Sequence, residues 1–118
     1  MWSRLSRITN WTELAEAARY NAKRLAVECG VSLRQLERFL PQITGQTPQR
    51  WLNEVRQRKA IELILSGQSI KEVSYHLGYK QSSHFSRDFK RFHGVAPSEM
   101  LGTDRSLRRQ AIKRVAFR

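Results

Sequence analysis

Apolar and polar residues alternate with helical periodicity over residues 69–94, SIKEVSYHLGYKQSSHFSRDFKRFHG. Ser69, followed three residues later by Glu72, forms a capping box, which predicts the start of a helix. Gly78 can adopt the left-handed conformation that ends a helix, and residues 78–81 then form a short turn. The first helix therefore has a mostly apolar face that consists of Ile70, Val73, Ser74 and Leu77.

The second periodic run has two contrasting faces. Phe85, Phe89 and Phe92 recur at i, i+4 and i+7, which places the aromatic rings on one helical stripe. The opposite side carries Ser83, Ser86, Arg87 and Lys90. A small, cationic face with hydrogen-bonding groups fits the DNA major groove, and helix, turn and such a helix are typical of a helix-turn-helix. The alternative is an ordinary helical hairpin with an aromatic core and a solvated face.

A similar arrangement is predicted earlier in the chain. Asn21 and Gly30 bound a helix over residues 22–29, and Ser32 with Gln35 forms another capping box. The run that follows places Leu33, Leu36, Leu40 and Ile43 on one side. The other side carries Arg34, Glu37 and Arg38. This segment is a second helix-turn-helix candidate.

The remaining segments predict a long connecting helix and, with weaker periodicity, an N-terminal helix and a C-terminal tail. Thr47 and Pro48 form a strong helix start, and the helix is expected to run to Leu65, about 27 Å at ~1.5 Å per residue. Asn10 with Glu13 predicts a helix over residues 11–20, with an apolar stripe of Leu14, Ala17 and Ala18. Residues 1–9 carry no strong pattern and are expected to form a loose, basic lead-in. In the tail, Leu107, Ala111 and Val115 can line a short helix, although a solvated basic tail is the favoured alternative.

The two halves of the chain resemble each other. Gly45, Pro48, Trp51 and Leu52 recur at one constant offset as Gly94, Pro97, Met100 and Leu101. At the same offset, Leu36, Arg38, Leu40 and Ile43 match Phe85, Arg87, Phe89 and Phe92. Matched glycines, matched proline starts and matched apolar stripes indicate a duplicated unit.

Charge and cysteine content narrow the class of protein. The 118 residues contain 22 Lys and Arg against 10 Asp and Glu, a formal net charge of +12 that is spread along the chain. This excess suits a polyanionic partner, nucleic acid first and an anionic membrane surface second. The lone Cys29 shares a face with Leu25 and Ala26, so it is expected to be a buried apolar residue rather than a nucleophile. No disulfide framework or multi-cysteine zinc site is possible.

The second half of the chain carries the motif Ile70, Val73, Gly78, Tyr79, His84-Phe85-Ser86-Arg87, Phe89-Lys90, Gly94 and Pro97. On these residues the chain, over roughly 11–101, resembles the DNA-binding domain of the AraC/XylS family of bacterial transcription regulators. The family implies an all-α fold of about seven helices, with two helix-turn-helix subdomains joined by a long linker helix. The first helix-turn-helix subdomain then covers residues 1–47, the linker helix 48–66 and the second subdomain 67–103, followed by a basic tail at 104–118.

The resemblance also implies the DNA contacts. Base contacts fall on Arg34, Glu37 and Arg38 in the first unit, and on Ser82, Ser83, Ser86 and Arg87 in the second. We expect phosphate contacts from Lys80, Gln81, Lys90 and Arg91. Glu37 either accepts from a cytosine or orients a neighbouring arginine, and both roles stay open. Pro41 departs from the family pattern, so the first recognition helix is expected to kink or stop near Leu40.

These features predict sequence-specific binding to double-stranded DNA and transcription regulation, with two recognition helices in successive major grooves about one DNA turn (~34 Å) apart. The alternative is a helical protein-interaction module without base readout. RNA binding is a third option, but the usual aromatic stacking platform is absent from the pattern. We expect no enzyme and no cofactor. We also expect no metal site, since His76, His84 and His93 have no acidic or cysteine residue at the spacing of metal ligands. RNA polymerase is a further candidate partner, an effector domain is expected if the chain is a fragment, and the predicted location is the cytoplasm, at the nucleoid.

Overall fold

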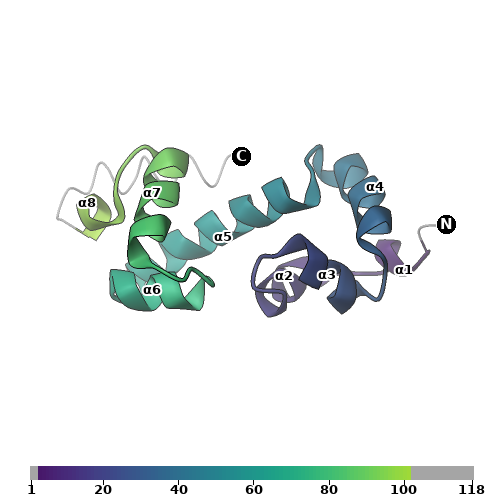
Figure 1. The fold of residues 1–118 in the computed structure, drawn as a ribbon, viewed down its shortest axis with the longest axis horizontal. Coiled ribbons are helices and arrows are strands. Elements are labelled where there is room, and N and C mark those ends of the chain that lie inside the picture. The colour runs from purple at the N-terminus through teal and green to yellow at the C-terminus, as the bar shows by residue number, and fades with distance from the viewer. Residues whose placement is uncertain (1–2, 102–118) are drawn as a thin grey trace. The chain divides into compact units, whose positions relative to one another are not determined.

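The computed structural model describes residues 3–101, and every regular element in that range is a helix (Figure 1). In chain order the helices are α1 (Ser3–Ser6), α2 (Trp11–Ala17), α3 (Ala22–Cys29), α4 (Leu33–Thr44), α5 (Pro48–Leu65), α6 (Ile70–His76), α7 (Ser82–His93) and α8 (Pro97–Leu101). None of these described helices combines the length and hydropathy that crossing a membrane requires. The predicted all-α class is confirmed. The predicted tail helix lies outside the described residues.

The described helices group into two compact units that divide within α5, after Arg56. The first unit contains α1 to α4 and the first part of α5. The second contains the rest of α5 and α6 to α8. In the first unit α3 packs against α4, and in the second α6 packs against α7. Each unit therefore holds one of the two predicted helix-turn-helix pairs.

The predicted helix starts at Ser32 and Ser69 are confirmed by their hydrogen bonds. The Ser32 hydroxyl accepts from the Gln35 amide at 3.1 Å, and Gln35 Oε1 accepts from the Ser32 amide at 2.9 Å, which completes the capping box. The Ser69 hydroxyl accepts from the Glu72 amide at 3.1 Å. The long helix begins and ends as predicted, over Pro48–Leu65. Local capping chemistry thus determines where these helices start.

The prediction for α2 is wrong in its end and in its buried face. The helix ends at Ala17 rather than near Tyr20, because Arg19 and Tyr20 adopt left-handed φ values of 51° and 59°. Ala15 and Ala18 are buried, whereas Ala17 is exposed. Since Ala15 and Ala18 lie about one turn apart, the buried face is rotated from the predicted stripe.

Two expectations for the N-terminal segment are also wrong. The sequence predicts no element before residue 10, yet α1 forms there, with Leu5 only 2% exposed. Arg4 Nη1 donates to the Gly30 carbonyl at 2.7 Å, which fastens α1 to the turn after α3. Asn10 occupies the N-cap of α2, but its side chain makes no capping hydrogen bond. Its φ of −103° and ψ of 48° lie outside the extended region that capping side chains need.

The sequence predicts a kink or a stop of helix α4 near Leu40. Helix α4 runs through Pro41 to Thr44, so the stop is wrong, and the kink stays a prediction. Proline removes the amide that would bond the Glu37 carbonyl. Glu37 is exposed, so water can replace the missing donor. The Thr44 hydroxyl donates to the Leu40 carbonyl at 2.7 Å and closes the last turn of the helix.

The buried face of α4 differs from the prediction at its C-terminal end. Ile43 was expected in the core but is 57% exposed, whereas Phe39 is 7% exposed. Ile43 has a suitable angular position, but it lies in the last turn, just before the helix ends at Gly45, where its side chain stays uncovered. Phe39 stacks on Trp11 with ring centroids 6.1 Å apart, and Trp11 meets Trp51 edge-on at 6.1 Å. Aromatic packing therefore secures the recognition helix in the first unit.

Candidate nucleic-acid interface

The aromatic stripe holds α7 in the second unit, as the sequence predicts. Phe85 and Phe89 are fully buried, and Phe92 is partly buried. Gly78 adopts a φ of +84° in the turn after α6, which confirms the predicted left-handed residue. Because the stripe faces the core, the opposite side of α7 is free to face a ligand.

That opposite side carries the predicted base-contacting residues of the second unit. Ser83, Arg87 and Lys90 are exposed, while Ser82 and Ser86 are partly buried. Arg87 and Lys90 make no ion pair or hydrogen bond through their side chains with any residue that the structure describes. Binding of Arg87 and Lys90 to an anionic partner would therefore break no side-chain hydrogen bond or ion pair with residues 3–101.

The predicted phosphate-contacting residues lie on the turn before α7 and along the same helix. Lys80, Gln81, Lys90 and Arg91 are all exposed. The Ser83 hydroxyl donates to Gln81 Oε1 at 3.5 Å, a long contact at the start of the helix. In sequence these residues lie before and after the predicted base-contacting positions of α7, which is the arrangement that contacts to the DNA backbone need.

The first unit presents an equivalent face on α4. Leu36 and Leu40 are buried, and Arg34, Glu37 and Arg38 are exposed on the other side. Within residues 3–101, the Glu37 carboxylate forms no ion pair with either arginine. The guanidinium groups of Arg34 and Arg38 are therefore available to bind an anionic partner, and the Glu37 carboxylate does not fix their positions.

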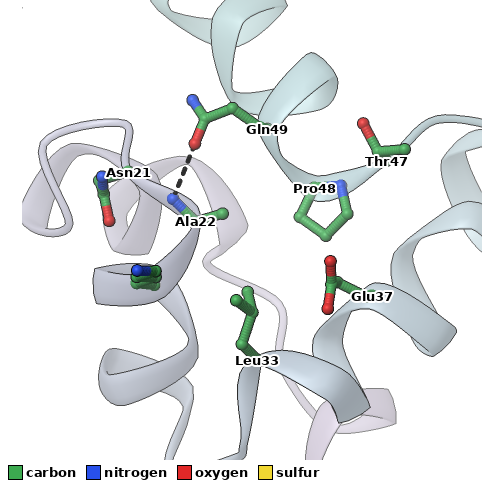
Figure 2. Close-up of a pocket in the computed structure, with 8 residues that line it drawn as sticks. Asn21, Ala22, Leu33, Glu37, Thr47, Pro48 and Gln49 are labelled. Carbon is green, nitrogen blue, oxygen red and sulfur yellow. Dashed lines mark hydrogen bonds between the residues drawn. The ribbon is translucent and has the colours of Figure 1, made fainter.

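A shallow pocket of about 410 Å³ lies beside Glu37 in the first unit (Figure 2). It is lined by Asn21, Ala22, Lys23, Leu33, Glu37, Thr47, Pro48 and Gln49. Glu37 thus faces the first turn of α5, whose N-terminal dipole favours a negative charge. Sequence reasoning missed this environment, because the pocket is lined by three segments that are distant in sequence, residues 21–23, residues 33 and 37, and residues 47–49.

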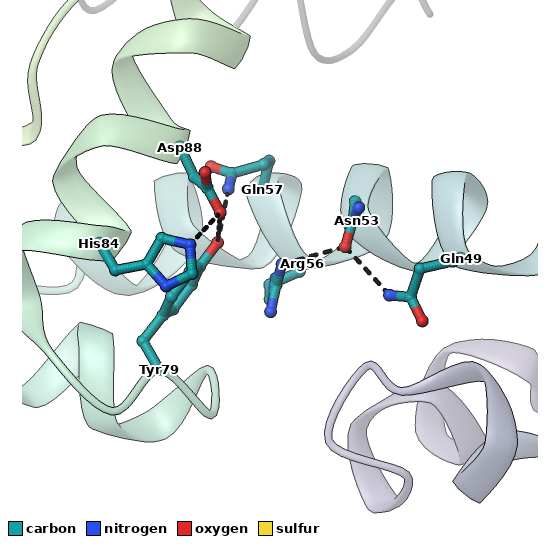
Figure 3. A network of polar contacts seen from close by, with 7 residues as sticks. All are labelled: Gln49, Asn53, Arg56, Gln57, Tyr79, His84 and Asp88. Carbon is teal, nitrogen blue, oxygen red and sulfur yellow. Dashed lines mark hydrogen bonds and ion pairs between the residues drawn. The ribbon is translucent and has the colours of Figure 1, made fainter.

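Gln49, on the first turn of α5, fastens the strained loop of the first unit. Its Nε2 donates to the Tyr20 carbonyl at 2.9 Å, and its Oε1 accepts from the Ala22 amide at 3.0 Å. Gln49 also bonds Asn53, whose Oδ1 accepts from Arg56 at 3.0 Å (Figure 3). The left-handed residues before α3 are therefore held by a side chain from α5.

A second polar network holds α7 within the second unit (Figure 3). The Tyr79 hydroxyl accepts from Gln57 Nε2 at 3.2 Å and donates to Asp88 Oδ2 at 3.1 Å. His84 Nε2 lies 3.7 Å from the same Asp88 oxygen. His93 Nε2 bonds the Gln57 carbonyl at 3.3 Å, a contact in which the imidazole must be the donor. Sequence reasoning missed this network, although Gln57 is a polar residue on the apolar stripe of α5 that includes Ala60, Ile61 and Ile64.

The sequence contains one cysteine, Cys29. Cys29 is buried, as predicted, and burial, followed by the nearby Glu28 charge, raises the pKa of its thiol. The raised pKa keeps the thiol protonated and unreactive near neutral pH. No group of three or more potential metal ligands occurs among the described residues.

Two tight helical pairs, each with an aromatic or aliphatic core face and an exposed cationic face, define a helix-turn-helix DNA-binding domain. The model of the helix-turn-helix domain family matches residues 25–103. The transcriptional activator RhaS of Escherichia coli O157:H7 is 38% identical over 99 residues, covering 83% of this chain and 36% of the relative. RhaS of Escherichia fergusonii is 40% identical over 109 residues, covering 89% of this chain and 38% of the relative.

Solved structures agree with these relatives. A transcriptional regulator with an AraC-type DNA-binding domain from Chromobacterium violaceum has a TM-score of 0.68 at 27% identity, covering 86% of this chain and 94% of that chain. The C-terminal domain of the response regulator AraT from Geobacillus stearothermophilus has a TM-score of 0.66 at 27% identity, covering 83% and 88%. The chain belongs to the AraC-type helix-turn-helix family of transcription regulators. It spans little more than a third of the length of the RhaS relatives.

Proposed function

We propose that this chain recognises a specific double-stranded DNA sequence with two helices, α4 and α7, and thereby regulates transcription. The observation that carries the proposal is the pair of exposed cationic faces, in which Arg34, Arg38 and Arg87 have no partner among the described residues. In this proposal the two helices enter successive major grooves on one side of the duplex. The subdomains are residues 1–47 and 67–103, the linker is 48–66, and 104–118 form a basic tail.

The proposed base contacts follow from donor geometry. Arg87 and Arg38 form bidentate hydrogen bonds to guanine O6 and N7, and Arg34 is a third candidate. Glu37 accepts from the N4 amine of a cytosine. Its lack of an ion pair with the neighbouring arginines favours this role over that of orienting them. Ser82, Ser83 and Ser86 allow a close approach of α7 to the bases.

The proposed phosphate contacts supply affinity rather than sequence choice. Lys80, Gln81, Lys90 and Arg91 bind backbone oxygens on either side of α7. The net charge of +12 adds a long-range attraction to DNA. Binding is therefore expected to weaken steeply as salt concentration rises, since it releases counterions.

The wider context is also part of the proposal. RhaS relatives are named transcriptional activators, which supports activation, with RNA polymerase as a partner. Those relatives are much longer than this chain, which supports an effector domain in the complete protein if the chain is a fragment. A regulator of this kind acts in the bacterial cytoplasm at the nucleoid.

The test is selection of bound duplexes from a random DNA pool, followed by affinity measurements on the selected site. Arg87→Ala should lower affinity for that site by about 1–3 kcal/mol and relax the preference at one base pair. An equal loss on every sequence would identify Arg87 as a phosphate contact. Failure to select any sequence would favour the protein-interaction module instead.

A further inference from the structure

Asp88 occupies an unusual position for an acidic residue on a DNA-reading helix. It directly follows Arg87 in α7, and its side chain is 24% exposed. A carboxylate that pointed outward here would repel DNA phosphates. The hydrogen bond from the Tyr79 hydroxyl instead holds Asp88 toward the interior of the second unit.

Gln57, the buried residue of this network, adds little to the stability of the fold. Gln57 is 3% exposed, and its Oε1 is buried without a hydrogen-bond partner in the part of the chain that the structure describes. A buried, unsatisfied amide oxygen is destabilising, whereas an apolar side chain at this site would carry no such penalty. The amide group is used only through Nε2, which donates to Tyr79. This asymmetry points to a role in orientation.

Apolar packing alone leaves the roll of α7 weakly determined. Phe85 and Phe89 bury their rings, but hydrophobic contact is non-directional, so a small rotation about the helix axis changes little buried area. Reading a base edge needs a side chain placed within roughly 0.5 Å and 10–20°. Hydrogen bonds are directional, and the chain from Gln57 through Tyr79 to Asp88 joins α5 to α7.

We infer that Tyr79 is a positioning residue for sequence readout: its hydroxyl, held between Gln57 of α5 and Asp88 of α7, sets the orientation of α7 from which Arg87 meets its base. This inference rests on the proposed function. Tyr79 touches no base itself. Its effect on selectivity passes through the helix that carries Arg87.

The first experiment compares Tyr79→Phe with the wild-type chain. The variant keeps the ring, whose centroid lies 5.4 Å from that of Phe85. It loses the hydroxyl and therefore the hydrogen bonds to Gln57 and Asp88. Affinities are measured for the selected duplex and for a scrambled duplex of equal length at one salt concentration. We expect the ratio of the two affinities to fall about fivefold, the effect of about one net hydrogen bond. In an Arg87→Ala background the same substitution should leave the ratio unchanged, because the reader is already absent.

Asp88→Asn and Asp88→Ala form a matched pair. Both remove the same negative charge, so both should raise non-specific affinity equally, but only asparagine keeps an acceptor for the Tyr79 hydroxyl. We expect Asp88→Asn to keep the wild-type ratio within about twofold and Asp88→Ala to lose about fivefold. This pair decides the matter if Tyr79→Phe does not fold, as judged by urea unfolding.

Equal losses of affinity on both duplexes, or a ratio lost in the Arg87→Ala background as well, would overturn the positioning role. An unchanged ratio in Tyr79→Phe and Asp88→Ala would also overturn it. In either case the proposed function stands if the wild-type chain selects a DNA site. If the wild-type chain selects none, both the proposed function and this inference fail.

Discussion

Gly30 and Gly45 offer a controlled measurement of one tertiary contact. Both end a helix of the first unit and have nearly the same left-handed backbone, with φ of 70° and 72°. An alanine in this conformation is strained by about 1–2 kcal/mol. A Cβ on Gly45 would meet nothing within 4 Å. Gly45→Ala should therefore lower the free energy of unfolding by about 1–2 kcal/mol, the backbone strain alone.

Gly30 has the same backbone but a close neighbour. A Cβ there would lie 2.7 Å from Arg4 Nη1, the atom that donates to the Gly30 carbonyl. Arg4 is exposed and flexible, so its guanidinium would swing away rather than force the backbone apart. The additional loss is therefore one exposed, charge-assisted hydrogen bond, about 0.5–1 kcal/mol. Gly30→Ala should be destabilising by about 1.5–3 kcal/mol in total, about 0.5–1 kcal/mol more than Gly45→Ala.

Urea unfolding followed by circular dichroism measures both variants in the wild-type chain and in an Arg4→Ala background. In that background Gly30→Ala and Gly45→Ala should have equal effects, because the contact is already gone. Equal effects in the wild-type chain would show that the Arg4 hydrogen bond contributes nothing. A persistent excess for Gly30→Ala without Arg4 would show that another part of α1 obstructs the turn, and would refute the reasoning.

Three further predictions concern charge. Glu37→Gln should change the preferred base at one position of the selected site, by about 1–3 kcal/mol if Glu37 reads a cytosine; a uniform gain on all sequences would contradict this. Lys90→Ala should make the slope of log affinity against log salt less negative by about 0.9 and leave base preference unchanged, as measured by fluorescence anisotropy. Because burial raises the pKa of Cys29, its protonated form is favoured in the folded state. The contribution of Cys29 to the free energy of unfolding should therefore be constant below the ordinary thiol pKa of 9.0 and should fall as pH rises above it. Urea unfolding of Cys29→Ala should lack this decline.

Local chemistry in the sequence was sufficient to predict most of the helices that carry the site. The Ser32 box, the Pro48 start and the left-handed Gly78 depend on residues close in sequence, and the structure confirms all three. The outward faces of α4 and α7 follow from periodicity, since burial of Leu36 or Phe85 determines which residues face away.

The features that the sequence did not reveal depend on distant contacts or local overrides. The left-handed Tyr20 is held by Gln49, 29 residues further on, and periodicity carries no trace of that bond. Ile43 has the angle of a core residue but lies beyond the reach of its neighbours. Pro41 fits within α4 because the carbonyl that it leaves unpaired belongs to an exposed residue. For Tyr20 a tertiary contact prevails over intrinsic preference, whereas Ile43 and Pro41 depend on where the helix ends and on which groups face solvent.

Among the described residues, the Gln57 side chain forms a hydrogen bond through Nε2 but none through its buried Oε1. We expect this arrangement to lower the thermal stability of the domain and to increase the selectivity of DNA binding. Gln57→Leu would fill the same buried position without a stranded oxygen, so we expect its melting temperature to rise. The same substitution would leave the phenol of Tyr79 without its donor and loosen the helix that carries Arg87. Laboratory evolution that selects only for thermal stability should therefore replace Gln57 in early rounds. The resulting variants should have higher melting temperatures and lower selectivity for their DNA site. Evolution under selection for accurate gene control should retain Gln57.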